Sequence, residues 1–186
     1  MKKIMNSSLS IKDVDKTVEL YGWVSKKRDL GGLIFIDLRD RSGIIQLVVN
    51  PEKSCYEIAS TLKSEYVIKV NGVISKRENI NKNIDTGEIE VIVDTLEIIN
   101  KSNEIPFEIS NNTTALEDTR LKYRYLDLRR DDIRNKIITR HNITKSVRNF
   151  LDNEGFLDIE TPILCKSTPE GARDYLVPSR VNKNSF

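Results

Sequence analysis

Cationic, amide and aromatic side chains are concentrated in a few short stretches of the first half of the chain. Lysine and arginine bind phosphate groups, amide and carboxylate side chains read the edges of unpaired bases, and an exposed ring can stack on a base. The cations in stretch 25–32 are Lys26, Lys27 and Arg28, and the amides in stretch 76–87 include Asn79 and Asn81. Together these residue types have the chemistry of a site for single-stranded RNA. A run of charges alone is more commonly a solvated surface, so the elements that carry these residues decide the question.

Five apolar, β-branched stretches separated by turn-forming residues predict strands. A helical stretch at about 54–63 lies between the third and fourth of them. Five strands with a helix in this place are typical of the OB-fold, a small Greek-key barrel, although other small barrels also have five strands. The expected strands are Thr17–Lys26, Leu33–Arg39, Ile44–Asn50, Tyr66–Ser75 and Ile89–Ile99.

Strand alternation predicts which side chains face outward. The inward sets are apolar, and they leave Phe35, Gln46 and Glu90 on the outer surface. OB-folds grip oligonucleotides with the face of strands 2 and 3 and with the loops joining strands 1–2 and 4–5. The stretches 25–32 and 76–87 occupy those two loops, which favours RNA binding. The alternative for Phe35 is an aromatic patch covered by a neighbouring loop. The expected inward sets are Ile34, Ile36 and Leu38; Ile45, Leu47 and Val49; and Ile89, Val91 and Val93.

The second half of the chain has a different character. Residues 100–119 are polar and indicate a linker. An apolar stripe then predicts a helix over Arg134–Glu154, and Gly155 is a natural stop for it. Phe156–Ile159 is expected to be extended, and Pro162 ends it. A helix and a strand cannot bury a core alone, so we expect this domain to be incomplete. The stripe consists of Ile133, Ile137, Ile143, Val147, Phe150 and Leu151.

Composition excludes several classes of protein. The net charge of +2 is small, so any nucleic-acid binding depends on a local basic patch. The sequence shows no signal peptide and no apolar run long enough to span a membrane, and it predicts a soluble cytoplasmic protein. Cys55 and Cys165 are expected to be free thiols. His141 has no nucleophile partner, and we expect no metal site.

Several stretches resemble the bacterial-type aspartyl-tRNA synthetases, a class II family. The likeness covers essentially the whole chain. It is carried by GWVSKKRDLGGLIFIDLRDRSGIIQLVV at 22–49, TGEIEV at 86–91, RLKYRYLDLRR at 120–130, GFLDIETPIL at 155–164 and TPEGARDYLVPSRV at 168–181.

The resemblance implies functions for individual residues. The barrel would bind the anticodon loop of tRNA(Asp). Their place in the loop between strands 1 and 2, rather than the resemblance, predicts that Lys26 and Lys27 contact phosphates. The helix and the strand that follows it would build a homodimer interface, although such a helix also packs within its own domain. Glu170 would contact the ammonium of L-aspartate, but a glutamate beside Gly171 is more commonly a turn residue. Positions matching the family's base contacts are Arg28, Phe35, Gln46, Asn79, Asn81 and Glu90.

The same resemblance implies that residues 1–186 lack part of the catalytic machinery. Class II synthetases need a second motif with an arginine on ATP and a glycine-rich third motif, and no glycine follows Gly171 here. ATP and Mg²⁺ would serve the full-length enzyme, and residues 1–186 alone are expected to be inactive. Expected domains are an anticodon-binding OB-fold at 1–104, a hinge at 105–130 and the start of the catalytic domain at 131–186. The alternative is a free-standing OB-fold module that binds single-stranded RNA without catalysis.

Overall fold

The computed structural model describes residues 4–164, 175 and 177–182. The chain divides into two compact units, Met1–Tyr123 and Arg124–Phe186.

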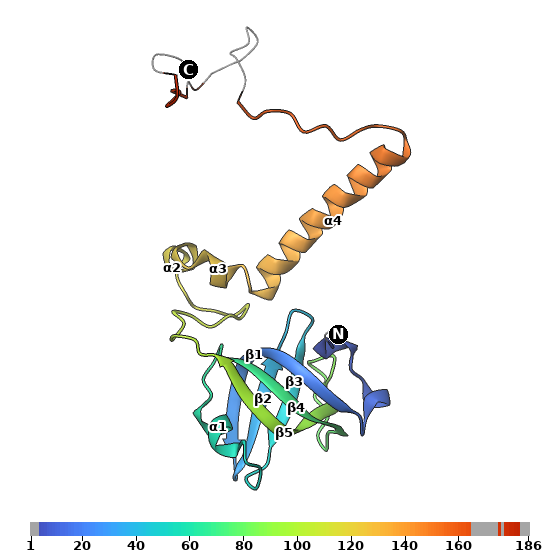
Figure 1. Ribbon diagram of the computed structural model, residues 1–186, viewed down its shortest axis with the longest axis vertical. Coiled ribbons are helices and arrows are strands. Elements are labelled where there is room, and N and C mark those ends of the chain that lie inside the picture. Colours follow the sequence, from blue (N-terminus) through green and yellow to red (C-terminus); the bar gives the residue numbers. More distant parts are fainter. Residues whose placement is uncertain (1–3, 165–174, 176, 183–186) are drawn as a thin grey trace. The chain divides into compact units, whose positions relative to one another are not determined.

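The first unit contains a closed barrel of five strands (Figure 1). Around the barrel the strand order is β1-β2-β3-β5-β4, with β4 pairing back to β1. Strands β3 and β5 run parallel, and every other neighbouring pair is antiparallel. This topology and the helix after β3 confirm the predicted OB-fold. The elements of the unit are η1 (Asn6–Ser8), η2 (Ile11–Asp13), β1 (Thr17–Leu30), β2 (Leu33–Arg39), β3 (Ile44–Val49), α1 (Tyr56–Thr61), β4 (Val67–Lys76), β5 (Ile89–Asn100) and α2 (Glu117–Lys122).

The first strand is longer than the sequence predicts. A loop was expected over 25–32, but β1 continues to Leu30 and pairs with β2, while its first half pairs with β4. A bulge between Val24 and Lys26 marks the change of partner. The hairpin closes through Gly31 and Gly32, whose φ angles are +64° and +89°. Two left-handed residues form the turn type whose twist matches the flanking strands.

The barrel interior confirms the predicted alternation. Along β2 the exposed fractions of Ile34, Ile36 and Leu38 are 1%, 0% and 0%, while Leu33 and Phe35 are half-buried on the other face. The inward residues expected on β3 and β5 are also fully buried. Cys55 joins this core from the start of α1 as a free thiol. Burial raises the pKa of the Cys55 thiol above its ordinary value.

The expected linker contains short helices. One is α2, and in the second unit α3 (Arg124–Asp127) precedes the long helix α4 (Asp131–Asn153). Gly155 ends α4 with φ +85°, the Gly155 N–H donates to the Asp152 carbonyl, and the Phe156 N–H donates to the Leu151 carbonyl. These two bonds form a Schellman motif, which confirms the predicted stop.

The apolar stripe of α4 is exposed within the second unit. The exposed fractions of Ile143 and Phe150 are 61% and 63%, and the other members are exposed or half-buried. Residues 156–164 form no strand, because a strand needs a pairing partner that the described part of this unit does not supply. The expected domain boundaries at 104 and 130 stay predictions.

Candidate nucleic-acid interface

A hollow of about 420 Å³ lies on the outside of the barrel. It is lined by the end of the β1–β2 hairpin, the outer faces of β3 and β5, and the beginning of the β4–β5 loop. Four predicted base-contacting residues from four elements, together with Asn79, therefore meet at one place. The lining residues are Arg28, Leu30, Leu33, Phe35, Gln46, Ser75, Lys76, Arg77, Glu78, Asn79 and Glu90.

Strand register explains why these side chains converge. Arg28 pairs with Phe35 across β1 and β2, and Gln46 pairs with Glu90 across β3 and β5. Paired residues in neighbouring strands point to the same face. Outward-facing positions that are far apart in sequence are thereby brought together on one surface. Phe35 lies on that face and is half-buried.

Gln46 is the centre of a polar network. Its Oε1 accepts hydrogen bonds from Arg77 Nη2 at 3.0 Å and from Arg28 Nη2 at 3.4 Å, and its Nε2 donates to Glu90 Oε2 at 2.8 Å. These neighbours cover it, so Gln46 is only 4% exposed although it faces outward. Cations at the oxygen and an anion at the nitrogen fix the orientation of the amide, because the flipped arrangement would set like partial charges against both.

The carboxyl group of Glu90 is half-buried. Burial raises the pKa of the Glu90 carboxyl above its ordinary value, because burial penalises the charged form. The hydrogen bond from Gln46 and the charge of Arg77 act in the opposite direction but are smaller, and Glu78 adds to the increase. Glu90 therefore holds its proton more tightly than an exposed glutamate does.

The two predicted asparagines have different environments. Asn79 lines the hollow and is exposed. Asn81 does not line it. The Asn81 N–H donates to the Gly87 carbonyl at 3.0 Å, and Asn81 Oδ1 accepts from the Asn83 N–H at 3.0 Å. Asn81 thus shapes the β4–β5 loop, and its base contact stays a prediction.

The two lysines predicted to contact phosphates, Lys26 and Lys27, also lie in different environments. Lys26 is exposed on β1. Lys27 donates to the carbonyl of Ser60 in α1, and alternation places it on the opposite side of β1 from Arg28. Neither lysine lines the hollow, whereas Arg77 does. Arg77 is a cation of the stretch 76–87, and its bond to Gln46 could not be read from spacing.

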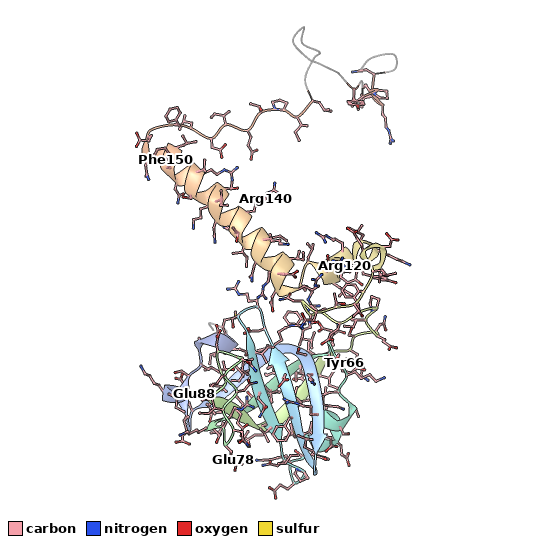
Figure 2. The ribbon with its side chains drawn as sticks, turned by 180° about the vertical axis from the view of Figure 1, so that it is seen from behind. Tyr66, Glu78, Glu88, Arg120, Arg140 and Phe150 are labelled. Carbon is pink, nitrogen blue, oxygen red and sulfur yellow. The ribbon has the colours of Figure 1, made fainter. Side chains whose placement is uncertain are left out.

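A larger cavity, of about 690 Å³, lies elsewhere on the first unit. Figure 2 labels one residue of each site, Tyr66 of this cavity and Glu78 of the hollow, toward opposite ends of the barrel. Two of the charged residues that line the larger cavity form an ion pair, in which Arg39 Nη2 donates to both carboxylate oxygens of Glu65 at 2.7 Å. None of the predicted site residues lines it.

Glu170 lies outside the described residues, so the predicted aspartate contact has no geometry here. Within the described ranges no three His, Cys, Asp or Glu side chains are grouped to hold a metal ion. No helix there has both the length and the apolar character that a membrane crossing requires.

Two family models match the chain. Residues 18–99 match "OB-fold nucleic acid binding domain", and residues 116–186 match "tRNA synthetases class II (D, K and N)". The fold and these matches are those of part of a class II tRNA synthetase.

Similarity to individual proteins identifies a family within this class. The chain is 56% identical over 182 residues to aspartate–tRNA(Asp/Asn) ligases of Bacillus mycoides and Bacillus thuringiensis, a match that spans 96% of this chain. It covers 31% of the length of these relatives. The chain belongs to the bacterial-type aspartyl-tRNA synthetase family.

Solved structures agree with the fold. The asparaginyl-tRNA synthetase of Pyrococcus horikoshii superposes with a TM-score of 0.79 at 27% identity, over 92% of this chain and 39% of that one. The aspartyl-tRNA synthetase of Entamoeba histolytica superposes with a TM-score of 0.81 at 19% identity, over 91% of this chain and 41% of that one.

Proposed function

We propose that this chain is the anticodon-binding part of an aspartate–tRNA ligase, which attaches L-aspartate to tRNA(Asp) through an aspartyl-adenylate made from ATP. The observation that carries the proposal is the hollow, where a ring, an amide, a carboxylate and two guanidinium groups meet on the outer face of an OB-fold barrel. Phe35 would stack on an unpaired base, Gln46 and Glu90 would face base edges, and Arg28 and Arg77 would neutralise phosphate charge.

Binding of RNA hairpins tests this proposal. We expect the 186-residue chain to bind a hairpin carrying the anticodon loop of tRNA(Asp) more tightly than the same hairpin with a scrambled loop. Affinity for both hairpins should fall as salt rises, because phosphate contacts release counterions. Fluorescence anisotropy measures both effects. Equal affinity for the two loops would contradict anticodon recognition.

Catalysis is proposed for the full-length enzyme only, with ATP and Mg²⁺ as its cofactors. Residues 1–186 contain neither the arginine-bearing second motif nor the glycine-rich third motif that would stabilise charge on the reacting phosphate. We therefore expect no aspartate-dependent exchange of pyrophosphate into ATP by the purified chain. Detectable aspartyl-adenylate formation would refute this expectation.

Assembly and location follow from the same proposal. The full-length enzyme would form a homodimer through α4 and the segment after it, and it would act in the cytoplasm. Glu170 would contact the ammonium of the bound aspartate. A free-standing RNA-binding module is the weaker alternative, because residues 116–186 match the synthetase family model.

The range of tRNA substrates has a specific test. The Bacillus relatives are named as aspartate–tRNA(Asp/Asn) ligases, whereas Leu30 of this chain resembles the strictly aspartate-specific type. Leu30 lines the hollow and is exposed at the end of β1. Charging of tRNA(Asp) and tRNA(Asn) by the full-length enzyme, compared as kcat/KM, separates the two substrate ranges.

A further inference from the structure

One carboxylate beside the hollow has no part in the proposed contacts with RNA. Asp37 faces outward on β2 and pairs in register with Gln46. Its side chain is 23% exposed, and it does not line the hollow. A negative charge at this place repels a polyanion. Electrostatics alone therefore predicts that RNA would bind more tightly without Asp37.

The contacts of Asp37 give it a different role. Asp37 Oδ1 accepts a hydrogen bond from Arg28 Nη2 at 2.8 Å, and the same Nη2 lies 3.4 Å from Gln46 Oε1. The bond to Asp37 joins opposite charges and is the shorter of the two, so the position of the guanidinium is set mainly by Asp37. The chain of contacts runs from Asp37 through Arg28 and Gln46 to Glu90.

We propose that Asp37 is a positioning residue, which holds Arg28 against Gln46 and so presets the RNA-reading surface before RNA arrives. The inference rests on the proposed function of the hollow. An arginine side chain has many rotamers, and ordering it during binding costs affinity. Asp37 removes that cost in the free protein, and this gain outweighs its repulsion of phosphate.

The substitution Asp37→Asn tests the proposal through the sign of its effect. It keeps the size of the side chain and removes one negative charge. We expect hairpin affinity to fall by up to roughly tenfold, because a neutral amide oxygen holds the guanidinium more weakly than a carboxylate does. The matched control is Glu19→Gln, which removes a carboxylate paired with Lys69 Nζ at 2.8 Å on another part of the barrel. Glu19→Gln should leave hairpin affinity unchanged or slightly increased.

A double-mutant cycle tests whether Asp37 acts through Arg28. In the Arg28→Ala background, Asp37→Asn should have no further effect on hairpin affinity, because the group that Asp37 positions is gone. Circular dichroism and thermal unfolding of each variant report whether the barrel is intact.

Each outcome has a definite meaning. Unchanged or tighter binding by Asp37→Asn overturns the positioning role. The role is also overturned if Asp37→Asn weakens binding as much in the Arg28→Ala background as it does in the wild-type protein. Unfolding of Asp37→Asn also overturns it, because the role would then be structural. Wild-type protein that does not distinguish the tRNA(Asp) loop from a scrambled loop would instead refute the proposed function, and this inference with it.

Discussion

At the scale of the residue, the hollow is organised by opposite charges around one neutral amide. Gln46 has guanidinium groups at its oxygen and a carboxylate at its nitrogen, so its hydrogen-bonding pattern is fixed in the free protein. An amide held in this way keeps one arrangement of donor and acceptor, and an amide free to flip has two. If the hollow binds RNA as proposed, the neighbours of Gln46 contribute to selectivity together with the residue itself.

Phe35→Ala separates a role in binding from a role in folding. The ring lies on the outer face, so its removal should leave the barrel nearly as stable and weaken hairpin binding by the stacking contribution of ~1–3 kcal/mol. Its neighbour Ile36 is fully buried, and Ile36→Ala should lower the free energy of unfolding by about 2–5 kcal/mol. Chemical denaturation and anisotropy measure the two quantities. Unfolding by Phe35→Ala with intact RNA affinity would contradict the assigned faces.

Glu90→Gln gives a prediction in pH. Because burial raises the Glu90 pKa in the folded state, the folded protein binds this proton more tightly than the unfolded chain. The resulting stabilisation is present below the ordinary glutamate value of 4.5 and is lost as pH rises through the raised pKa. The glutamine variant does not lose it. The Tm of Glu90→Gln relative to wild type should therefore increase from acid to neutral pH, as calorimetry would show. A constant difference in Tm would contradict the burial effect.

The sequence predicts the outward set but not its contacts. Alternation identifies Phe35, Gln46 and Glu90 as outward-facing, because a strand buried on one side has a period of two. Alternation cannot show that Arg28 and Arg77 reach the same amide from separate elements, so the burial of Gln46 was not foreseen. Because the sequence predicts a loop over 25–32, alternation was not applied there, and Lys27, which bonds to α1, was not distinguished from Arg28 beside it.

At the scale of the element, the β1–β2 hairpin sets the position of Arg28. The run KKRD has the composition of a loop, and the sequence therefore predicted a loop where the strand continues. Pairing with β2 decides the outcome, because each residue from Lys26 to Leu30 has a partner across the hairpin. The short helices α2 and α3 were missed for a related reason. Helices of one or two turns have little intrinsic stability, and their sequence signal is correspondingly weak.

The Gly31–Gly32 turn allows a test free of packing effects. A Cβ atom added at either glycine would contact nothing within 4 Å, so only the backbone conformation opposes a larger residue. Gly31→Val should lower the free energy of unfolding by ~1–2 kcal/mol, the cost of a left-handed conformation. Gly31→Asn is the matched control, because asparagine adopts that conformation readily. Equal losses in the two variants would contradict this account of the turn.

At the scale of the whole molecule, the two units differ in how completely they bury their apolar residues. The barrel encloses its own core, whereas α4 exposes a row of apolar side chains within its unit. Contiguous exposed apolar surface indicates contact with another protein surface. In the proposed enzyme this contact would be made by the catalytic domain and by a second copy of the chain.

Self-association of the full-length enzyme should depend on that row. Phe150→Asp places a charge on the apolar stripe and should weaken the homodimer, shifting the sedimentation coefficient toward that of a monomer. Arg140, labelled with Phe150 on α4 in Figure 2, is an exposed polar residue of the same helix. Arg140→Gln is the control and should leave the dimer intact. A dimer that survives Phe150→Asp unchanged would exclude this face as the interface.

The division of β1 between two neighbours has a consequence for how the barrel opens. Its first half bonds to β4 and its second half to β2, so detaching the strand breaks both sets of backbone bonds. Local opening of one half is opposed by the bulge region, which stays bonded to Tyr66 and Glu65 on the far side. The hydrogen-bonded amide protons of both halves of β1 should therefore exchange with deuterium together, at the slow end of the protein's range.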